Sequence, residues 1–296
     1  MATAPSSPAI AISIDLEEYF QVEVMNGVVE RAQWEAMPAR AEAATDRLLA
    51  AFAEAGARAT FFAVGWLAER QPQLLRRITA AGHELGCHSY WHRPVFRLTP
   101  DEFAQDTRRA VAALADAAGV AVRGYRAPNF SLRCDGSMDW AFDTLAANGF
   151  TYDSSVHPIR HPFYGAPRAP RLPFPLANGM WEFPMATVAV GARRLPMAGG
   201  GFWRLAPLAY TRWGLRQALR QGLQPVCYLH PWELDPGQPR QALARRQRLR
   251  HYTGLAGMEA KLRRLLRDFR CLPLADLYAQ QLHGREAALV AGGASA

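Results

Sequence analysis

The chain has 296 residues, half of them apolar and a fifth charged, which is enough for one large domain with a sizeable core. The net charge is +8, but ten basic and only two acidic residues lie between Arg240 and Arg270, so the rest is neutral. This excludes a chain that is basic throughout, as many nucleic-acid-binding domains are. There is no signal-peptide pattern, no apolar run long enough for a membrane-spanning helix, and no CxxC pair among four separated cysteines. We therefore predict a soluble cytoplasmic protein.

The first half of the chain alternates between short apolar runs and helical patterns. Buried strands are predicted at 9–14, 59–64, 83–89 and 121–125, and helices at 40–55, 72–81, 99–118 and 136–147. Gly56 ends the first of these helices, and Pro72 begins the second. A repeated strand–helix unit is typical of an α/β fold with a parallel sheet, open or closed.

The pattern loosens after residue 157, where a proline-rich segment predicts a long surface loop. Two more strands are predicted at 181–188 and 224–232, with a helix at 207–221 between them and a helix over 240–282. The tail from about Glu286 is expected to be frayed. We predict a single domain over 1–296, with a core at about 9–235 and a C-terminal helical extension at about 240–283.

Two histidines and a group of carboxylates have the spacing of a metal site. His88 and His92 are four residues apart, which on a helical turn puts both on one side. Asp15, Glu17 and Glu18 end the first predicted strand, where parallel α/β folds place their active sites. Two histidines and one carboxylate leave coordination positions open for water, and a second carboxylate nearby could act as a base. A solvated acidic turn is the alternative.

Two further motifs end predicted strands. Arg126, in RGYRAPNFS, can clamp a carboxylate, and the backbone N–H groups after Pro128 can face a developing oxyanion. His230, in YLHPWE, is either a general acid or a capped buried ring. Trp91 and Trp232 flank the proposed site histidines and could stack on a ligand ring or pack in the core.

The motifs SIDLEEYF, HSYWH, RGYRAPNFS, TYDSSVHPIRHPFYGAP and YLHPWELDP together resemble the five motifs of the NodB-type polysaccharide deacetylases, carbohydrate esterase family 4. More narrowly, they resemble the subfamily of exopolysaccharide loci linked to exosortase and PEP-CTERM sorting. The resemblance covers about residues 9–280. It implies a distorted (β/α) barrel of the NodB-homology type, with a metal ion at the C-terminal ends of the strands.

The resemblance also implies roles for individual residues. Asp15 matches the catalytic base, His230 matches the general acid, and Arg126 and Asp153 match the residues that orient them. Asn129 matches the position whose backbone N–H holds the oxyanion. A divalent metal, expected to be Zn²⁺, is implied on Glu17, His88 and His92. Many members have two adjacent aspartates in the first motif, so Glu18 stays an alternative to Glu17. In an ideal strand Glu17 shares a face with Asp15, which favours Glu17.

The implied activity is the hydrolysis of N-acetyl groups on amino sugars of a polysaccharide or its lipid-linked precursor, in exopolysaccharide biosynthesis. A deformylase or cyclic amide hydrolase on the same site is an alternative, as is a non-catalytic carbohydrate-binding protein. We expect no nucleic-acid partner and no integral membrane segment. The arginine-rich 240–270 segment could face an acidic glycan, an anionic membrane in a peripheral association, or only solvent.

Overall fold

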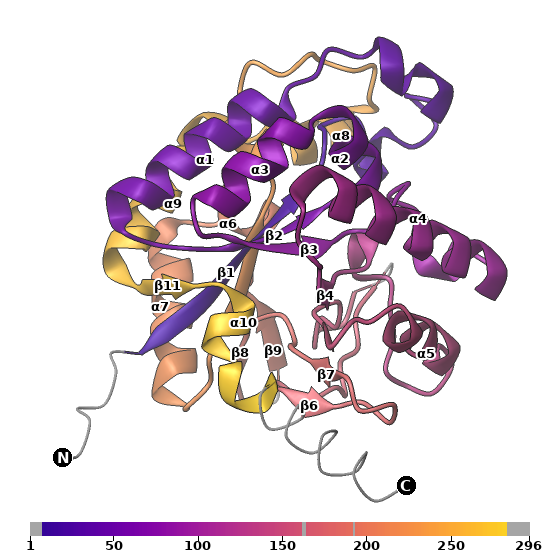
Figure 1. The fold of residues 1–296 in the computed structure, drawn as a ribbon. Coiled ribbons are helices and arrows are strands. Elements are labelled where there is room, and N and C mark those ends of the chain that lie inside the picture. Colours follow the sequence, from indigo (N-terminus) through magenta and orange to yellow (C-terminus); the bar gives the residue numbers. More distant parts are fainter. Residues whose placement is uncertain (1–7, 162–163, 192, 283–296) are drawn as a thin grey trace, which may run out of the picture.

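The computed structural model describes residues 8–161, 164–191 and 193–282, and its centre is a curled, mostly parallel sheet (Figure 1). The path through this sheet is β10 (Val226–Leu229), β1 (Ala9–Leu16), β2 (Thr60–Ala63), β3 (Glu84–Cys87), β4 (Gly124–Tyr125), β5 (Tyr152–Asp153), β7 (Trp181–Glu182) and the antiparallel β6 (Phe174–Pro175). An isolated parallel bridge joins Met185, just after β7, to Val226 of β10. The two ends of the path therefore approach each other, and the predicted distorted barrel is confirmed.

Helices cover the outside of the sheet, as in other parallel α/β folds (Figure 1). Glycine or a capping box fixes several helix ends. Gly56 ends the first helix with a left-handed φ of 59°, and Thr99 and Glu102 form a capping box at the start of the fourth. The helices are α1 (Ala41–Ala55), α2 (Gly65–Arg70), α3 (Pro72–Ala80), α4 (Pro100–Ala118), α5 (Asp139–Ala147), α6 (Gly201–Leu205), α7 (Leu208–Arg220), α8 (Arg245–Tyr252), α9 (Leu255–Asp268) and α10 (Leu274–Leu277).

Every residue of β1 is buried, because β1 has strand neighbours on both sides and helices cover the sheet. The parallel register pairs Asp15 with Phe62 of β2 and Ala63 of β2 with Cys87 of β3. The carboxyl ends of these strands therefore meet at one edge. Short 3-10 helices lie in the connecting segments: η1 (Glu23–Met25), η2 (Arg31–Ala36), η3 (Val95–Arg97), η4 (Pro128–Phe130) and η5 (Pro231–Leu234).

The single helix predicted over 240–282 is wrong. The segment forms α8, α9, the strand β11 (Arg270–Leu272) and α10. Gly254 separates α8 from α9 because its φ of 84° is left-handed, and a Cβ there would lie 2.6 Å from the carbonyl oxygen of Arg204. β11 pairs with Ala9–Ala11 of β1, so the extension also contributes to the sheet. The expected frayed tail lies outside the described residues.

One other prediction needs correction. The strand expected at 181–188 divides into β7 and β8 (Thr187–Val190), and β8 forms an unpredicted hairpin with β9 (Arg193–Pro196). Among the described residues, no helix is long and apolar enough to cross a membrane. The single-domain organisation stays a prediction.

Candidate metal centre

Glu17, His88 and His92 converge at the carboxyl edge of the sheet, and their donor atoms all lie within 4.8 Å of one another. Glu17 follows β1 and His88 follows β3, and all three side chains are buried. The two histidines are not on a helix, because Ser89 and His92 have left-handed φ values of 65° and 52°. The loop between them is held by Asp106 of α4, whose carboxylate accepts the backbone N–H groups of residues 90 and 91 at 2.7 and 3.1 Å.

The donor atoms of this centre fit a divalent cation. His88 Nδ1 lies 2.7 Å from the carbonyl oxygen of Arg126, so this nitrogen carries the proton and Nε2 keeps a free lone pair. Burial holds the pKa of His88 well below its usual range, which keeps the ring neutral. Glu17 Oε2 lies 2.7 Å from His92 Nε2, yet this buried oxygen makes no well-directed hydrogen bond within the described chain. A cation between these groups would give this buried oxygen the partner that a well-directed hydrogen bond does not supply.

The Glu18 carboxylate binds the start of helix α1 instead. It accepts the backbone N–H groups of Arg40, at 2.9 and 3.1 Å, and of Ala41, at 3.1 Å. These donors belong to the start of α1, where backbone N–H groups lack partners within the helix. Glu18 therefore caps a helix, and the structure brings Glu17 rather than Glu18 to the histidines.

Arg126 positions Asp15 beside the metal centre. The fully buried guanidinium donates from Nη1 to Asp15 Oδ1 at 2.8 Å and to Ser13 Oγ at 2.6 Å. Its Nε and Nη2 atoms donate to the carbonyl and hydroxyl oxygens of Ser154, both at 2.9 Å. With so many partners the guanidinium has one orientation, and it fixes the Asp15 carboxylate. The role expected for Arg126 stays a prediction.

His230 lies on the other side of the same centre. Its Nε2 atom is 3.9 Å from Asp15 Oδ2 and 3.6 Å from Glu17 Oε1. Its Nδ1 atom is 3.0 Å from Glu233 Oε2, and Glu233 Oε1 accepts a 2.6 Å hydrogen bond from Arg204 Nε. Burial lowers the pKa of His230, but the hydrogen bond and charge of Glu233, with Glu17 and Asp15, outweigh burial and raise this pKa to about 9. The ring is thus protonated at neutral pH.

Glu233 and Arg204 were not predicted from the sequence. Burial raises the pKa of Glu233, but His230 and Arg204 outweigh it and lower this pKa to about 2, so Glu233 is a buried carboxylate ion. One local signal could have identified Glu233. It follows His230 by three residues, and Pro231 between them begins η5, so Glu233 has the spacing of a capping residue. Arg204 comes from α6, and no sequence spacing links it to this motif.

Asp153 does not occupy the position expected for it beside His230, which Glu233 takes instead. The Asp153 carboxylate accepts the backbone N–H of Ser155 at 2.9 Å and its hydroxyl at 2.7 Å. Ser155 Oγ in turn accepts the backbone N–H of Ala127 at 2.7 Å. Asp153 therefore supports the loop that follows Arg126, rather than the acid.

The three proposed substrate-binding residues differ in how much surface they offer. Asn129 has left-handed φ and ψ of 57° and 25°, and its Nδ2 donates to Glu23 Oε2 at 3.2 Å. Trp91 is half-buried, with Arg31 and Arg109 at 4.8 and 5.2 Å from its ring.

Trp232 is only 6% exposed, stacks on His230 and His251, and donates from Nε1 to Glu17 Oε1 at 3.1 Å. Trp232 thus holds Glu17 and has little surface left for a sugar.

Three further histidines are buried. His157, in the proline-rich loop, is 1% exposed and lies 5.6 Å from the ring of Phe130. Burial, with the charges of His161 and Arg126, lowers the pKa of His157 to about 3. His83 and His251 are buried as well. Local sequence could not show this, because other segments supply the covering side chains.

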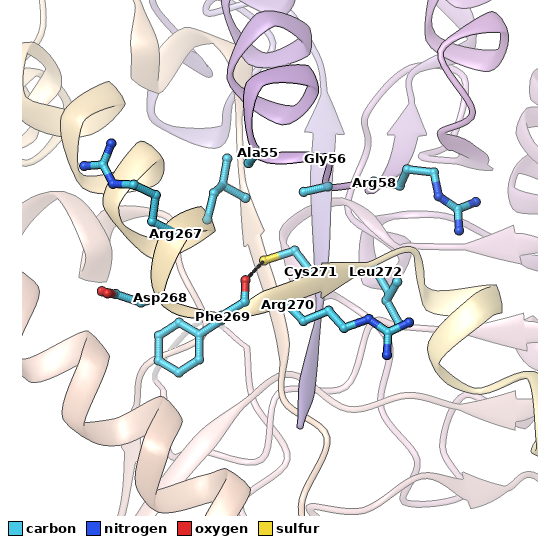
Figure 2. A pocket seen from close by; sticks show the side chains of 11 residues that line it. Ala55, Gly56, Arg58, Arg267, Asp268, Phe269, Arg270, Cys271 and Leu272 are labelled. Atoms are coloured by element: carbon cyan, nitrogen blue, oxygen red, sulfur yellow. Dashed lines mark hydrogen bonds between the residues drawn. The ribbon is translucent and has the colours of Figure 1, made fainter. Parts of the chain in front are cut away.

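The structure has a surface hollow of about 510 Å³, and Figure 2 shows the side chains that line it. It is lined by the end of α1, the end of α9 and β11, and β11 pairs only with the first three residues of β1. Asp15 and Glu17 lie at the opposite end of β1. The hollow is therefore separate from the candidate site.

Comparisons with known proteins find deacetylases that are similar to part of this chain. The chain is 30% identical over 124 residues to the peptidoglycan deacetylase of Helicobacter pylori, which is 42% of this chain and 41% of that protein. It is 33% identical over 100 residues to the chitooligosaccharide deacetylase of a Bradyrhizobium species, which is 33% of this chain and 42% of that protein. The chain thus spans less than half the length of the curated relatives it matches.

A solved structure from Mycobacterium smegmatis, classed as a polysaccharide deacetylase, has the same fold. The TM-score is 0.62 with 20% identity, over 96% of this chain and 94% of that one. Residues 154–279 match a domain of unknown function (DUF3473), and residues 33–136 match the polysaccharide deacetylase family. Residues 33–136 are therefore similar to the polysaccharide deacetylase family, in agreement with the resemblance of the sequence motifs.

Proposed function

We propose that this chain is a divalent-metal-dependent hydrolase that removes N-acetyl groups from amino sugars of a polysaccharide or its lipid-linked precursor, in exopolysaccharide biosynthesis. The observation that supports this proposal most directly is a single cluster of side chains, in which Asp15 and His230 lie beside the Glu17, His88 and His92 centre. The family match and the names of the two relatives support a deacetylase. The role in exopolysaccharide biosynthesis rests on the motif resemblance alone.

Glu17, His88 and His92 would hold the ion, with Zn²⁺ favoured by the nitrogen-rich donor set. A bound divalent ion polarises the amide carbonyl and lowers the pKa of a coordinated water. Two-histidine, one-carboxylate coordination leaves positions open for both. The neutral state of His88, and the buried Glu17 Oε2 without a well-directed hydrogen bond, are the local features that fit this ion.

Asp15 acts as the general base in this proposal. Its Oδ1 is occupied by Arg126, which leaves Oδ2 to take a proton from the water that attacks the acetyl carbon. Ser13 and Ser154 hold Arg126, so the base stays in one orientation during the reaction. The backbone around Asn129, in its left-handed turn, would face the developing oxyanion.

His230 acts as the general acid. Glu233 holds Nδ1, so Nε2 points toward Asp15 and Glu17 and carries the proton that the leaving nitrogen needs. When the C–N bond breaks, the nitrogen takes this proton and the sugar is released with a free amine. The acetyl carbon, with the oxygen from water, leaves as acetate.

The test is acetate release from N-acetylchitohexaose by purified, metal-loaded protein. Asp15→Asn is expected to lower kcat by about 10²–10⁴-fold, while the bound metal and the melting temperature change little. Asp46→Asn, an exposed carboxylate of α1, is the matched control and should behave as wild type. Formate release from the N-formyl hexamer distinguishes a deformylase. A folded, metal-loaded protein that releases neither acid would overturn the proposal and favour a carbohydrate-binding role.

A further inference from the structure

The helix α8 presents a cationic face that the proposed reaction does not use. Arg245, Arg246, Arg248 and Arg250 are exposed, and within the described part of the chain no acid lies in ion-pair distance of them. By contrast, Arg263 of α9 pairs with Glu54 and Glu259. Like charges four residues apart, as at 246 and 250, oppose helix formation. An anionic ligand on this face would relieve that repulsion.

This face is tied directly to the catalytic centre. Arg204, the residue that holds Glu233, donates from Nη1 to the carbonyl oxygens of Arg250 and His251, at 3.1 and 2.8 Å. The His251 ring stacks on Trp232 with 4.6 Å between centroids, and Trp232 stacks on His230 at 5.1 Å. The last turn of α8 is therefore only two aromatic rings from the proposed general acid.

The charge of Arg250 also acts on the proline-rich loop, at His161 and Tyr164. Burial and the charge of Arg250 lower the pKa of His161, and the same charge opposes the burial that raises the pKa of Tyr164. The two aromatic rings stack at 3.8 Å. Stacked rings within reach of the Arg250 charge suit a sugar chain that carries negative groups.

The surface of α8 favours such a chain over a membrane. A membrane-binding helix turns a broad apolar face outward. On α8 the only exposed large apolar residue described is Leu249, which is 58% exposed, while His251 and Tyr252 are buried against the protein. A guanidinium binds carboxylate or phosphate oxygens in a fixed fork, which a neutral glycan does not offer.

We propose that the arginine face of α8 is a substrate subsite, and that the glycan is an acidic polymer whose carboxylate or phosphate groups bind Arg246 and Arg250 while an N-acetyl group reaches the metal centre. The inference rests on the proposed deacetylase function. It names the substrate class as N-acetylated and negatively charged, and it makes α8 the element that selects it.

The experiment compares two hexasaccharide probes of equal length: hyaluronan, which is acidic and N-acetylated, and neutral N-acetylchitohexaose. Binding is measured by titration calorimetry and acetate release by kinetics, at low and physiological salt. The variant is Arg246→Glu/Arg250→Glu. Arg216→Glu/Arg220→Glu is the matched control, because those exposed arginines have the same spacing on α7, which Figure 1 shows away from α8.

We expect the α8 variant to weaken hyaluronan binding roughly tenfold or more, to raise KM by a similar factor and to leave kcat unchanged. Binding and turnover of the neutral probe, and the control variant, should match wild type. Equal use of both probes by every variant would overturn the inference and leave the deacetylase function standing. Hyaluronan binding through α8 without any acetate release would overturn the function instead. Arginine-dependent binding to phosphatidylglycerol vesicles, with none to hyaluronan, would make α8 a membrane site and also overturn the inference.

Discussion

Replacing Glu233 with glutamine separates the orientation of His230 from metal binding. Three donors face the two oxygens of this fully buried carboxylate: Arg204 Nε at 2.6 Å, His230 Nδ1 at 3.0 Å and the backbone N–H of His230 at 3.1 Å. An amide offers one oxygen, so at least one donor would face an NH₂ group. Arg204 would also keep a buried positive charge without its counter-ion.

Breaking a buried ion pair from one side costs about 3–5 kcal/mol. For a chain of this size the loss corresponds to a fall of about 10 °C in melting temperature. Because Glu233 does not touch the metal donors, the bound metal should be retained. Without its partner on Nδ1, His230 loses the orientation of a general acid, and kcat should fall by about 10²–10⁴-fold with little change in KM.

Differential scanning calorimetry, metal analysis and acetate-release kinetics check the three expectations on one preparation. Glu233→Asp keeps the charge and should recover more stability than glutamine does. Glu259→Gln is the control, since this half-buried carboxylate pairs with Arg47 and Arg263 at the surface and should cost less than about 1 kcal/mol. A Glu233→Gln protein with wild-type kcat would refute the positioning role, and one with wild-type stability would refute the buried ion pair.

Two further predictions concern stability. In a urea titration, Gly199→Ala should lower the free energy of unfolding by about 3 kcal/mol, because the new Cβ would lie 1.7 Å from the Tyr228 carbonyl oxygen at a φ of 146°. Gly257→Ala is the control, since a Cβ there would meet open space on α9, and it should be neutral or stabilising. Burial and the charge of Arg58 lower the pKa of His83 to about 4 from its usual 6.5, so the folded state resists protonation. The stability that the neutral His83 ring provides is fully present above pH 6.5, and about 3 kcal/mol of it is lost as the pH falls toward 4. His83→Gln should therefore flatten this part of the curve of unfolding free energy against pH. An unchanged slope would contradict the prediction.

The sequence predicted what depends on local pattern. Apolar runs followed by polar residues located β1, β2 and β3, and the parallel register then brought Glu17 and His88 to one edge. The choice of Glu17 over Glu18 followed from strand alternation. It agrees with the structure because Glu18 faces the first turn of α1 instead.

What the sequence could not predict depends on contacts between distant segments. Glu233 is held by Arg204, and Arg204 in turn holds the end of α8, a link across three elements without a common motif. The break at Gly254 and the strand β11 interrupt a segment whose leucines have helical spacing. Phe130, from another loop, and Tyr164, from the same loop, pack against His157 and bury it. The proline content of the loop predicted an exposed residue, because it carries no information about these contacts.

The most direct measurement of the central claim is the metal content of the purified protein after equilibration with Zn²⁺ and exhaustive dialysis at neutral pH. The account predicts stoichiometric metal in wild type and in Glu18→Gln, whose carboxylate caps α1, and loss of that metal in Glu17→Gln and His88→Ala. Chelation should abolish acetate release, and Zn²⁺ should restore it. Absence of bound metal in the wild type, or its loss in Glu18→Gln with retention in Glu17→Gln, would contradict the account.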